Sequence, residues 1–262
     1  MDIKKLKGMQ ADIELQAKKE IYDNLPDALI NFLKDDIVKH SLNEVKTRNS
    51  SVQSARVLNS WIEQGLLYVD ENDKGKINRF TREEAIWLNL LNELRTFGVS
   101  LDKLKMLREE LFKECFPGFT LFRFSILRTI LDNDQTLIIF SDGGIKLMSS
   151  KIYGSWLKQR MLPTHIHINF ALLINGIFSK NSFDAKIESS MLLENISSIK
   201  ILYFLKTGDF ETFKFELTKG DIRLIENSKQ LISNKDLINA VTTGKYFKAE
   251  VISNGRTFTL KA

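Results

Sequence analysis

The polar side chains best suited to recognition lie in two short segments, a stretch with helical periodicity and the polar loop that follows it. They are Gln53, Ser54, Arg56, Lys74, Lys76 and Arg79. The guanidinium of Arg56 can hold a guanine edge or a phosphate with two hydrogen bonds, and an amide such as Gln53 can read adenine. Cations in a loop bind phosphates without reading the bases. The two segments therefore predict binding to nucleic acid, against the alternative that these are ordinary solvated surface residues.

Other chemistry finds little support in the sequence. It contains no glycine-rich phosphate loop, no Gly-x-Ser-x-Gly elbow and no His-Glu-x-x-His zinc motif. His165 and His167 alternate on one face of a predicted strand, but no third ligand lies at a suitable spacing, so we interpret them as strand residues rather than as a metal site. Adjacent acids such as Asp35 and Asp36 are typical of solvated helix faces. We expect neither an enzyme nor a bound cofactor.

The composition is that of a globular protein. The 262 residues carry a net charge of +5, which permits binding to phosphate or anionic lipid without requiring it. Cys115 is the only cysteine, which excludes an intramolecular disulfide and fits a reducing compartment. The longest apolar run, INFALLINGIF, is too short to span a bilayer. We therefore expect a cytoplasmic protein outside the membrane.

The first recognition segment belongs to a helix predicted over residues 52–64. Its apolar positions fall on two adjoining stripes: Val52, Ala55, Val57, Leu58, Trp61 and Ile62. Its polar side carries Gln53, Arg56, Ser60 and Gln64. Such a helix can pack on its own domain with two sides and present hydrogen-bond donors to a groove with the third. Gly65 ends the helix, and residues 66–69 predict a strand that leads into the polar loop.

A second helix follows the loop. Thr81 and Glu84 have the spacing of a capping box at its start. Trp87 lies among aliphatic residues at helical spacing, which favours core packing over base stacking, as it does for the tryptophan of the first helix. Gly98 ends the second helix, and Ser100 is the predicted cap of the next one.

Three segments together resemble the MerR-type winged helix-turn-helix domain: LNEV, in a short helix predicted at LNEVKTR, the helix end WIEQGLL, and NRFTREEAIWLNLLNELRTFGVSLDKLKML. The resemblance covers about residues 41–111 and implies binding to double-stranded DNA. It places the first three recognition residues named above in the major groove, at the start of a recognition helix over residues 52–64. It places the last three against the DNA backbone, in a wing over residues 70–80.

The chain departs from the family pattern at several positions. Asn59 and Asn78 stand where the family often has arginines, so phosphate contacts there should be weaker. The charged residues around the motif give only a mild positive excess. They are Lys39, Lys46, Arg48, Arg56, Lys74, Lys76, Arg79 and Arg82, against Glu44, Glu63, Asp70, Glu71 and Asp73.

Self-association and effector binding stay open. MerR-type proteins commonly dimerise through a long coiled coil, whereas here the helix from Leu101 is cut at Pro117 and no heptad pattern follows. A homodimer formed elsewhere in the chain remains an option. Metal sensing in this family uses cysteines that this chain lacks, so the effector, if there is one, is unknown.

The rest of the chain predicts helices and hairpins. We expect a helix over residues 120–131, a hairpin in which QTLIIF and IKLM flank SDGG, a helix from Ser149 or Ser150 to Arg160, and a strand at THIHINF. Two later segments share one plan: ILYFLKTGDFETFKFELTKGDIRLIE and LINAVTTGKYFKAEVISNGRTFTLKA each combine a helix end, a glycine, an aromatic residue and a β-hairpin. We infer two copies of a helix plus β-hairpin unit.

The predicted fold class is α+β in three parts. These are a helical prelude with a MerR-like winged helix-turn-helix over residues 1–116, an α+β middle region over 117–195, and the duplicated helix/β-hairpin unit over 196–262. The predicted function is double-stranded DNA binding as a MerR-like transcriptional regulator. Two alternatives stay open: a protein-interaction or effector-binding module that retains the winged-helix shape, and an accessory DNA-architectural factor for recombination.

Overall fold

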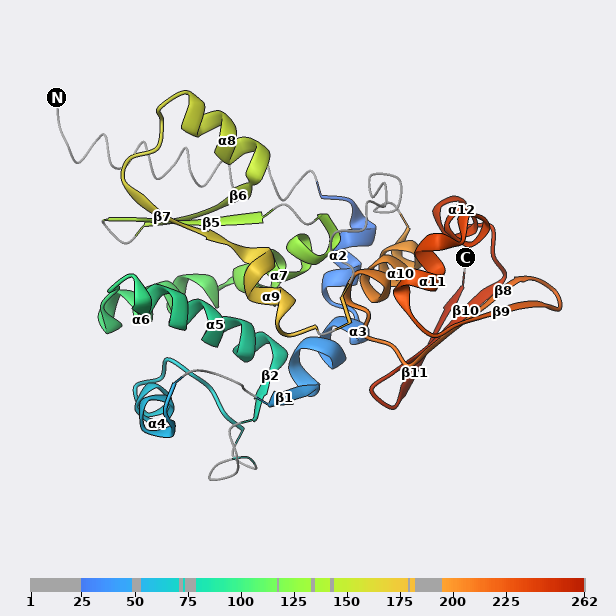
Figure 1. Cartoon of the computed structure of the whole chain (residues 1–262), viewed down its shortest axis with the longest axis horizontal. Helices are drawn as coiled ribbons and strands as arrows, with labels where there is room; N and C mark the ends of the chain where they lie inside the picture. The colour runs from blue at the N-terminus through green and yellow to red at the C-terminus, as the bar shows by residue number, and fades with distance from the viewer. Residues whose placement is uncertain are drawn as a thin grey trace.

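The computed structural model combines helices with small antiparallel sheets, which confirms the α+β class (Figure 1). It describes residues 25–48, 53–70, 73, 79–116, 118–132, 135–141, 144–178, 180–181 and 195–261. Two predicted site residues, Lys74 and Lys76, and the prelude before residue 25 lie outside the described residues. Every helix in the described part of the chain is too short or too polar to cross a membrane.

The described chain begins with short helical elements. These are α2 (Asp27–Leu33), α3 (Asp36–Lys39) and a π-helical turn (His40–Glu44). Pro26 is the N-cap of α2.

The short helix predicted at LNEVKTR is wrong in its second half. The helical turn ends at Glu44, the backbone becomes extended at Val45, and the next residues form β1 (Lys46–Arg48). β1 pairs antiparallel with β2 (Arg79–Thr81). This pairing gives hydrogen-bond partners to backbone groups that a longer helix would have satisfied internally.

The predicted recognition helix is α4 (Ala55–Glu63), followed by Gly65 with a positive φ of 73°. The strand predicted at residues 66–69 is wrong, because these residues, all of them described, form no strand. The backbone N–H groups of Leu66 and Leu67 instead donate to the carbonyl of Trp61, at 2.8 and 3.2 Å. They close the end of α4 and therefore do not take part in a sheet.

Two longer helices complete the N-terminal region: α5 (Arg82–Thr96) and α6 (Leu101–Leu111). Their predicted caps are confirmed, since the Thr81 hydroxyl accepts from the backbone N–H of Glu84 at 3.2 Å and Ser100 accepts from that of Lys103 at 3.4 Å. The predicted core role of Trp87 is also confirmed. Its side chain is fully buried and its indole N–H donates to a backbone carbonyl.

The middle region is a three-stranded antiparallel sheet with helices on both faces (Figure 1). Its elements are β3 (Glu114–Phe116), β4 (Phe119–Thr120), α7 (Leu121–Asp132), β5 (Gln135–Phe140), β6 (Ile145–Ser149), α8 (Ser150–Lys158), β7 (His165–Asn169) and α9 (Phe170–Asn175). The strand order is β6-β5-β7, which confirms the predicted hairpin and strand. Ser149 caps α8 as predicted, but the helix ends at Lys158, before the left-handed Arg160.

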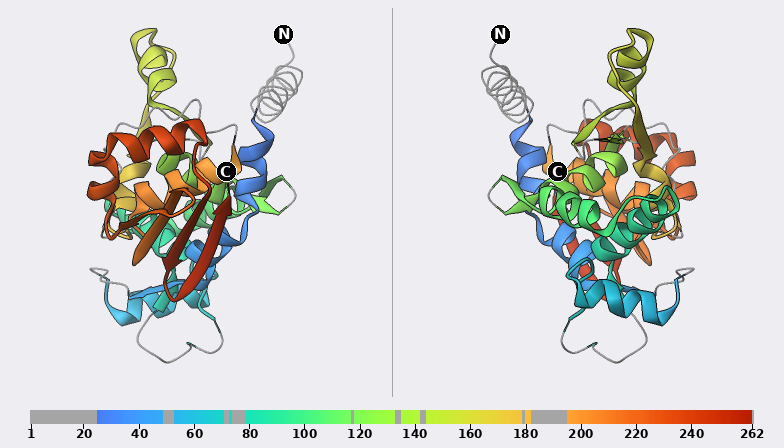
Figure 2. Two further views of the ribbon diagram at one scale, coloured as in Figure 1. Left: turned by 90° about the vertical axis from the view of Figure 1, so that its right-hand side faces the viewer. Right: turned by 90° about the vertical axis from the view of Figure 1, so that its left-hand side faces the viewer.

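The C-terminal region is a four-stranded sheet with three helices (Figure 2). Its elements are α10 (Ile196–Thr207), β8 (Thr212–Thr218), β9 (Asp221–Ile225), α11 (Ser228–Ser233), α12 (Lys235–Thr243), β10 (Lys248–Ser253) and β11 (Arg256–Lys261). The strand order is β11-β10-β8-β9, so the two hairpins join through their first strands. α11 was not predicted.

One hydrophobic core connects these regions. Buried apolar side chains form a continuous cluster that reaches from Leu29 in α2 to Leu260 in β11. α10 packs against α2 and α7, so a C-terminal helix contacts both earlier parts of the chain. The division into three domains stays a prediction. The buried contacts of α10 with α2 and α7 cross the boundaries between the predicted domains.

Candidate nucleic-acid interface

α4 is attached to the protein by one side. Leu58 and Trp61 are buried, and Val57 and Ile62 pack partly buried against the core. Ser54 is the N-cap, and its hydroxyl accepts from the backbone N–H of Val57 at 3.4 Å. Ser54, predicted to contact DNA, therefore also has a structural role in starting the helix.

The opposite side of α4 is polar and open. Arg56 is exposed in the first turn, and Gln53 is partly exposed just before the helix. Farther along, the Gln64 amide donates to the Ser60 hydroxyl at 2.9 Å, so these two side chains bind each other. Figures 1 and 2 place α4 at one extremity of the molecule, away from the C-terminal sheet. The structure thus brings Gln53, Ser54 and Arg56 together on an accessible end.

The ribbon of β1 and β2 contains Arg79. Phe80 is buried while Arg79 is exposed, so β2 faces the core with one side and solvent with the other. Arg79 is the register partner of Arg48 across the ribbon.

Two nearby cations are already engaged within the protein. Lys46 contacts the carboxylates of Asp70, at 2.6 Å, and Asp73. The hydrogen bond to Asp70 and, to a smaller extent, the one to Asp73 raise the pKa of Lys46. Arg82 was counted among the cations around the motif from its sequence position, and this interpretation is wrong, because Arg82 is buried.

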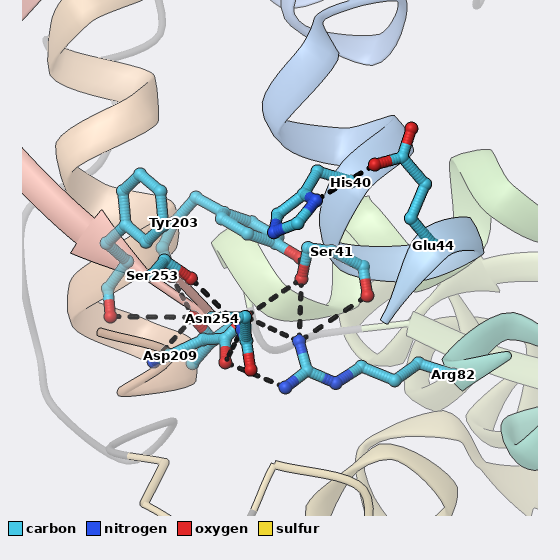
Figure 3. Close-up of polar contacts among 10 residues, drawn as sticks. His40, Ser41, Glu44, Arg82, Tyr203, Asp209, Ser253 and Asn254 are labelled. Carbon is cyan, nitrogen blue, oxygen red and sulfur yellow. Dashed lines mark hydrogen bonds and ion pairs between the residues drawn. The ribbon is translucent and has the colours of Figure 1, made fainter. Parts of the chain in front are cut away.

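Arg82 lies at the centre of a polar network that joins distant parts of the chain (Figure 3). Its Nη2 donates to Asp209 Oδ1 at 2.7 Å, and its Nη1 donates to Asp209 Oδ2 and to the Ser41 hydroxyl, the latter at 2.9 Å. The Tyr203 hydroxyl donates to that of Ser41 at 2.9 Å, and the Asn254 amide donates to Asp209 at 3.0 Å. The network therefore connects the start of α5 to the end of α10 and the turn between β10 and β11.

The electrostatics of this network favour a charged pair beside a neutral phenol. Burial raises the pKa of the Asp209 carboxyl, but the hydrogen bonds and charge of Arg82, with smaller contributions from Asn254 and Ser41, outweigh burial and hold the pKa below its ordinary value. Burial, and then the charge of Asp209, raises the pKa of the Tyr203 phenol. At neutral pH Asp209 is therefore ionised and Tyr203 is protonated.

The first turn of α5 carries three consecutive buried charges, and each binds a different element. Arg82 pairs with Asp209, the second residue after α10. Glu83 pairs with Arg123 of α7 at 2.9 Å, and Glu84 with Arg108 of α6 at 2.5 Å. Burial raises the pKa of Glu84, while Arg108 opposes that shift. Sequence reasoning identified only the capping role of this turn. Three adjacent charges at the start of an otherwise apolar helix were the available signal, but they do not reveal their partners.

The two histidines of β7 bind neighbouring side chains. His165 contacts the Pro163 carbonyl at 2.7 Å and the Tyr153 hydroxyl at 3.2 Å, and the Tyr153 ring stacks on His167. Burial, and then the charge of His165, lowers the pKa of His167. Over the residues that the structure describes, no group of three or more His, Cys, Asp or Glu side chains is arranged to hold a metal ion.

Comparison of the chain with protein-family models, curated proteins and solved structures finds no match. The assignment of a function therefore depends on the residues and contacts described above.

Proposed function

We propose that this chain binds double-stranded DNA as a MerR-like transcriptional regulator, with α4 in the major groove and the segment that includes Arg79 against the backbone. The observation that carries the proposal is the position of Arg56. It is exposed in the first turn of a capped helix whose opposite side is held by Leu58 and Trp61. A guanidinium in this position can reach base edges, and the packed side fixes the helix orientation.

The exposed end of the β1/β2 ribbon supports the same proposal. Arg79 is exposed on β2, and Arg48 is its register partner in β1. Exposed cations add affinity for the phosphates of DNA. This contribution does not depend on the base sequence and decreases as the salt concentration rises. The ribbon, α4 and α5 would then form the winged helix that the sequence predicts.

The C-terminal region fits a duplicated helix plus β-hairpin unit, as also predicted. Gly208 and Gly244 end α10 and α12 with left-handed φ angles of 63° and 65°. In the sheet, β8 and β10 pair antiparallel with Lys214 opposite Glu250, which suits a two-fold relation between the hairpins. Amide hydrogen exchange tests this relation, because equivalent central strands should exchange at similar, slow rates. Fast exchange in β8 or β10 alone would argue against it.

The test of DNA binding is a selection of duplex fragments with the full-length protein at stated salt concentrations. We expect an enriched sequence whose logarithmic affinity falls linearly with the logarithm of salt concentration. A promoter assay and a bending assay on that fragment would distinguish a regulator from an architectural factor. A palindromic site, with a dimeric mass in light scattering, would support a homodimer. Absence of any enriched fragment would reject the proposal.

A second candidate is an interaction module that retains the winged-helix shape without binding DNA. It is favoured by the engagement of Lys46 with Asp70 and Asp73 and by the burial of Arg82, which reduce the positive charge available near α4. The full-length protein would then recover a stoichiometric protein partner from nuclease-treated lysate, and Arg56→Ala would leave duplex binding unchanged. Recovery of a salt-sensitive DNA site would reject this candidate.

A further inference from the structure

A cavity of about 400 Å³ lies between the turn that joins α5 to α6 and one end of the sheet formed by β5 and β7. Val99 and Leu107 line it from the helical side, and Ile139 and Ile166 from the sheet. Small-molecule sites are commonly concave, mostly apolar and of this size. The cavity is lined by different residues from those of the candidate nucleic-acid interface, so a ligand here would not compete directly for α4.

Among the described residues that line the cavity, the one formal charge is that of a lysine. Lys103 of α6 contributes an ammonium, and the described lining contains no aspartate or glutamate. The Lys103 Nζ donates to the backbone carbonyl of Ser141 at 2.9 Å, which holds the ammonium near the sheet end of the cavity. A lysine ammonium has three donors, so it can keep this bond and still donate to a ligand. An anion is therefore favoured over a cation.

An aromatic wall with fixed orientation completes the cavity. His165 is anchored through both ring nitrogens, to the Pro163 carbonyl at 2.7 Å and to the Tyr153 hydroxyl at 3.2 Å. The Phe140 ring meets His165 edge to face, with centroids 6.4 Å apart. A wall held in this way is already shaped before a ligand arrives, which reduces the entropy lost on binding.

We propose that this cavity binds a small amphipathic anion, a carboxylate attached to an aliphatic body. The aliphatic part would cover Val99, Leu107, Ile139 and Ile166, and the carboxylate would accept a charge-assisted hydrogen bond from Lys103. The apolar walls make the affinity depend on the length of the aliphatic chain. The ammonium makes the protein bind the acid more tightly than the matching alcohol. This site does not depend on DNA binding and stands or falls separately from it.

Isothermal titration of the full-length protein with hexanoate, octanoate and octan-1-ol tests the proposal. We expect one site per chain and an affinity that rises about fourfold for each added methylene. Octan-1-ol, which lacks the charge, should bind at least tenfold more weakly than octanoate. The same affinity for octanoate and octan-1-ol, several weak sites, or no saturable binding would overturn the proposal.

Two variants locate the site. Lys103→Met should weaken octanoate binding at least tenfold, whereas Lys105→Met, on the same helix but outside the lining, should leave it unchanged. Thr164→Trp places a large side chain in the exposed part of the lining and should also weaken binding. A thermal melt shows whether each variant is folded. If Lys103→Met does not fold, Thr164→Trp serves as the test. Unchanged octanoate affinity in a folded Lys103→Met or Thr164→Trp protein would contradict the assignment.

Discussion

Arg79 and Arg82 are close in sequence, yet they belong to two different regions of the molecule. Arg79 lies exposed on the outer face, which we define as α4 with the β1/β2 ribbon. Arg82 belongs to the inner network, formed with Ser41, Tyr203, Asp209 and Asn254, and only 10% of its side chain is exposed. The comparison shows that the position of a cation in a motif does not decide whether it serves a partner or the fold. Burial and the nearest carboxylate decide it.

The two regions also differ in how far they reach along the chain. The outer face is assembled from residues near one another in sequence, whereas the inner network joins the start of α5 to residues after α10 and β10. A fragment that ends at residue 116 would lack Asp209, the carboxylate that binds Arg82. The DNA-binding proposal is therefore tested on the full-length protein.

The largest expected effect comes from removing the centre of the inner network. Arg82→Ala leaves Asp209 buried without its cation, and the loss of one partner of a buried pair typically costs about 3–5 kcal/mol. Urea denaturation followed by tryptophan fluorescence measures the free energy of unfolding. Arg79→Ala is the matched control and should change stability by less than about 0.5 kcal/mol. Equal effects of the two substitutions would remove the distinction between the regions.

A second pair of variants tests how tightly the inner network is packed. Gly208→Ala and Gly244→Ala both force a left-handed residue to carry a Cβ, at a cost of about 1–2 kcal/mol. A Cβ at Gly208 would also lie 2.0 Å from the carbonyl oxygen of Lys180, while one at Gly244 has no heavy neighbour within 4 Å. Thermal and urea unfolding should therefore show a larger loss for Gly208→Ala. A larger loss for Gly244→Ala would contradict the packing described here.

The pH dependence of stability should report on Asp209. Its folded-state pKa is held below the unfolded value, so its stabilising contribution is present above the unfolded pKa and is lost as pH falls through the folded one. The free energy of unfolding should therefore decrease below about pH 4. Asp209→Asn should remove part of this slope. The free energies of unfolding of the variant and the wild type should therefore approach each other at low pH. The same slope in Asp209→Asn as in the wild type would contradict this role of Asp209.

A further substitution, on the outer face, should change stability less than the loss of Arg82. Ser54→Ala removes the hydroxyl that caps α4, a change that costs about 1 kcal/mol. Ser54→Asp, which keeps a capping acceptor, should retain this stability but weaken binding to DNA through repulsion of phosphate. The comparison of urea unfolding with DNA affinity separates the capping role from the predicted contact. Identical DNA affinity of Ser54→Asp and the wild type would argue against a DNA phosphate near this residue.

Sequence reasoning succeeded where short-range chemistry decides structure. The caps at Thr81 and Ser100 and the turn at Gly65 each depend on residues within a few positions. The same is true of the hairpin formed by β5 and β6.

Sequence reasoning failed where segments distant in the chain meet. Residues 46–48 form a strand because β2, more than thirty residues later in the chain, pairs with them. The pairing of Arg82 with Asp209 has no local signature, since the two residues lie in different parts of the chain. The predicted recognition residues Gln53, Ser54 and Arg56 lie together at the start of α4. Their role in DNA binding stays a prediction.

The most direct test of the account compares two single-charge variants of the full-length protein on the DNA fragment that it selects. Arg56→Ala removes the exposed guanidinium of α4, and Arg223→Ala removes one from β9 on the C-terminal sheet. With both variants as stable as the wild type, we expect Arg56→Ala to lower the affinity about tenfold or more at fixed salt concentration, and Arg223→Ala to leave it unchanged. Equal affinities of the two variants would contradict the placement of α4 in the DNA groove.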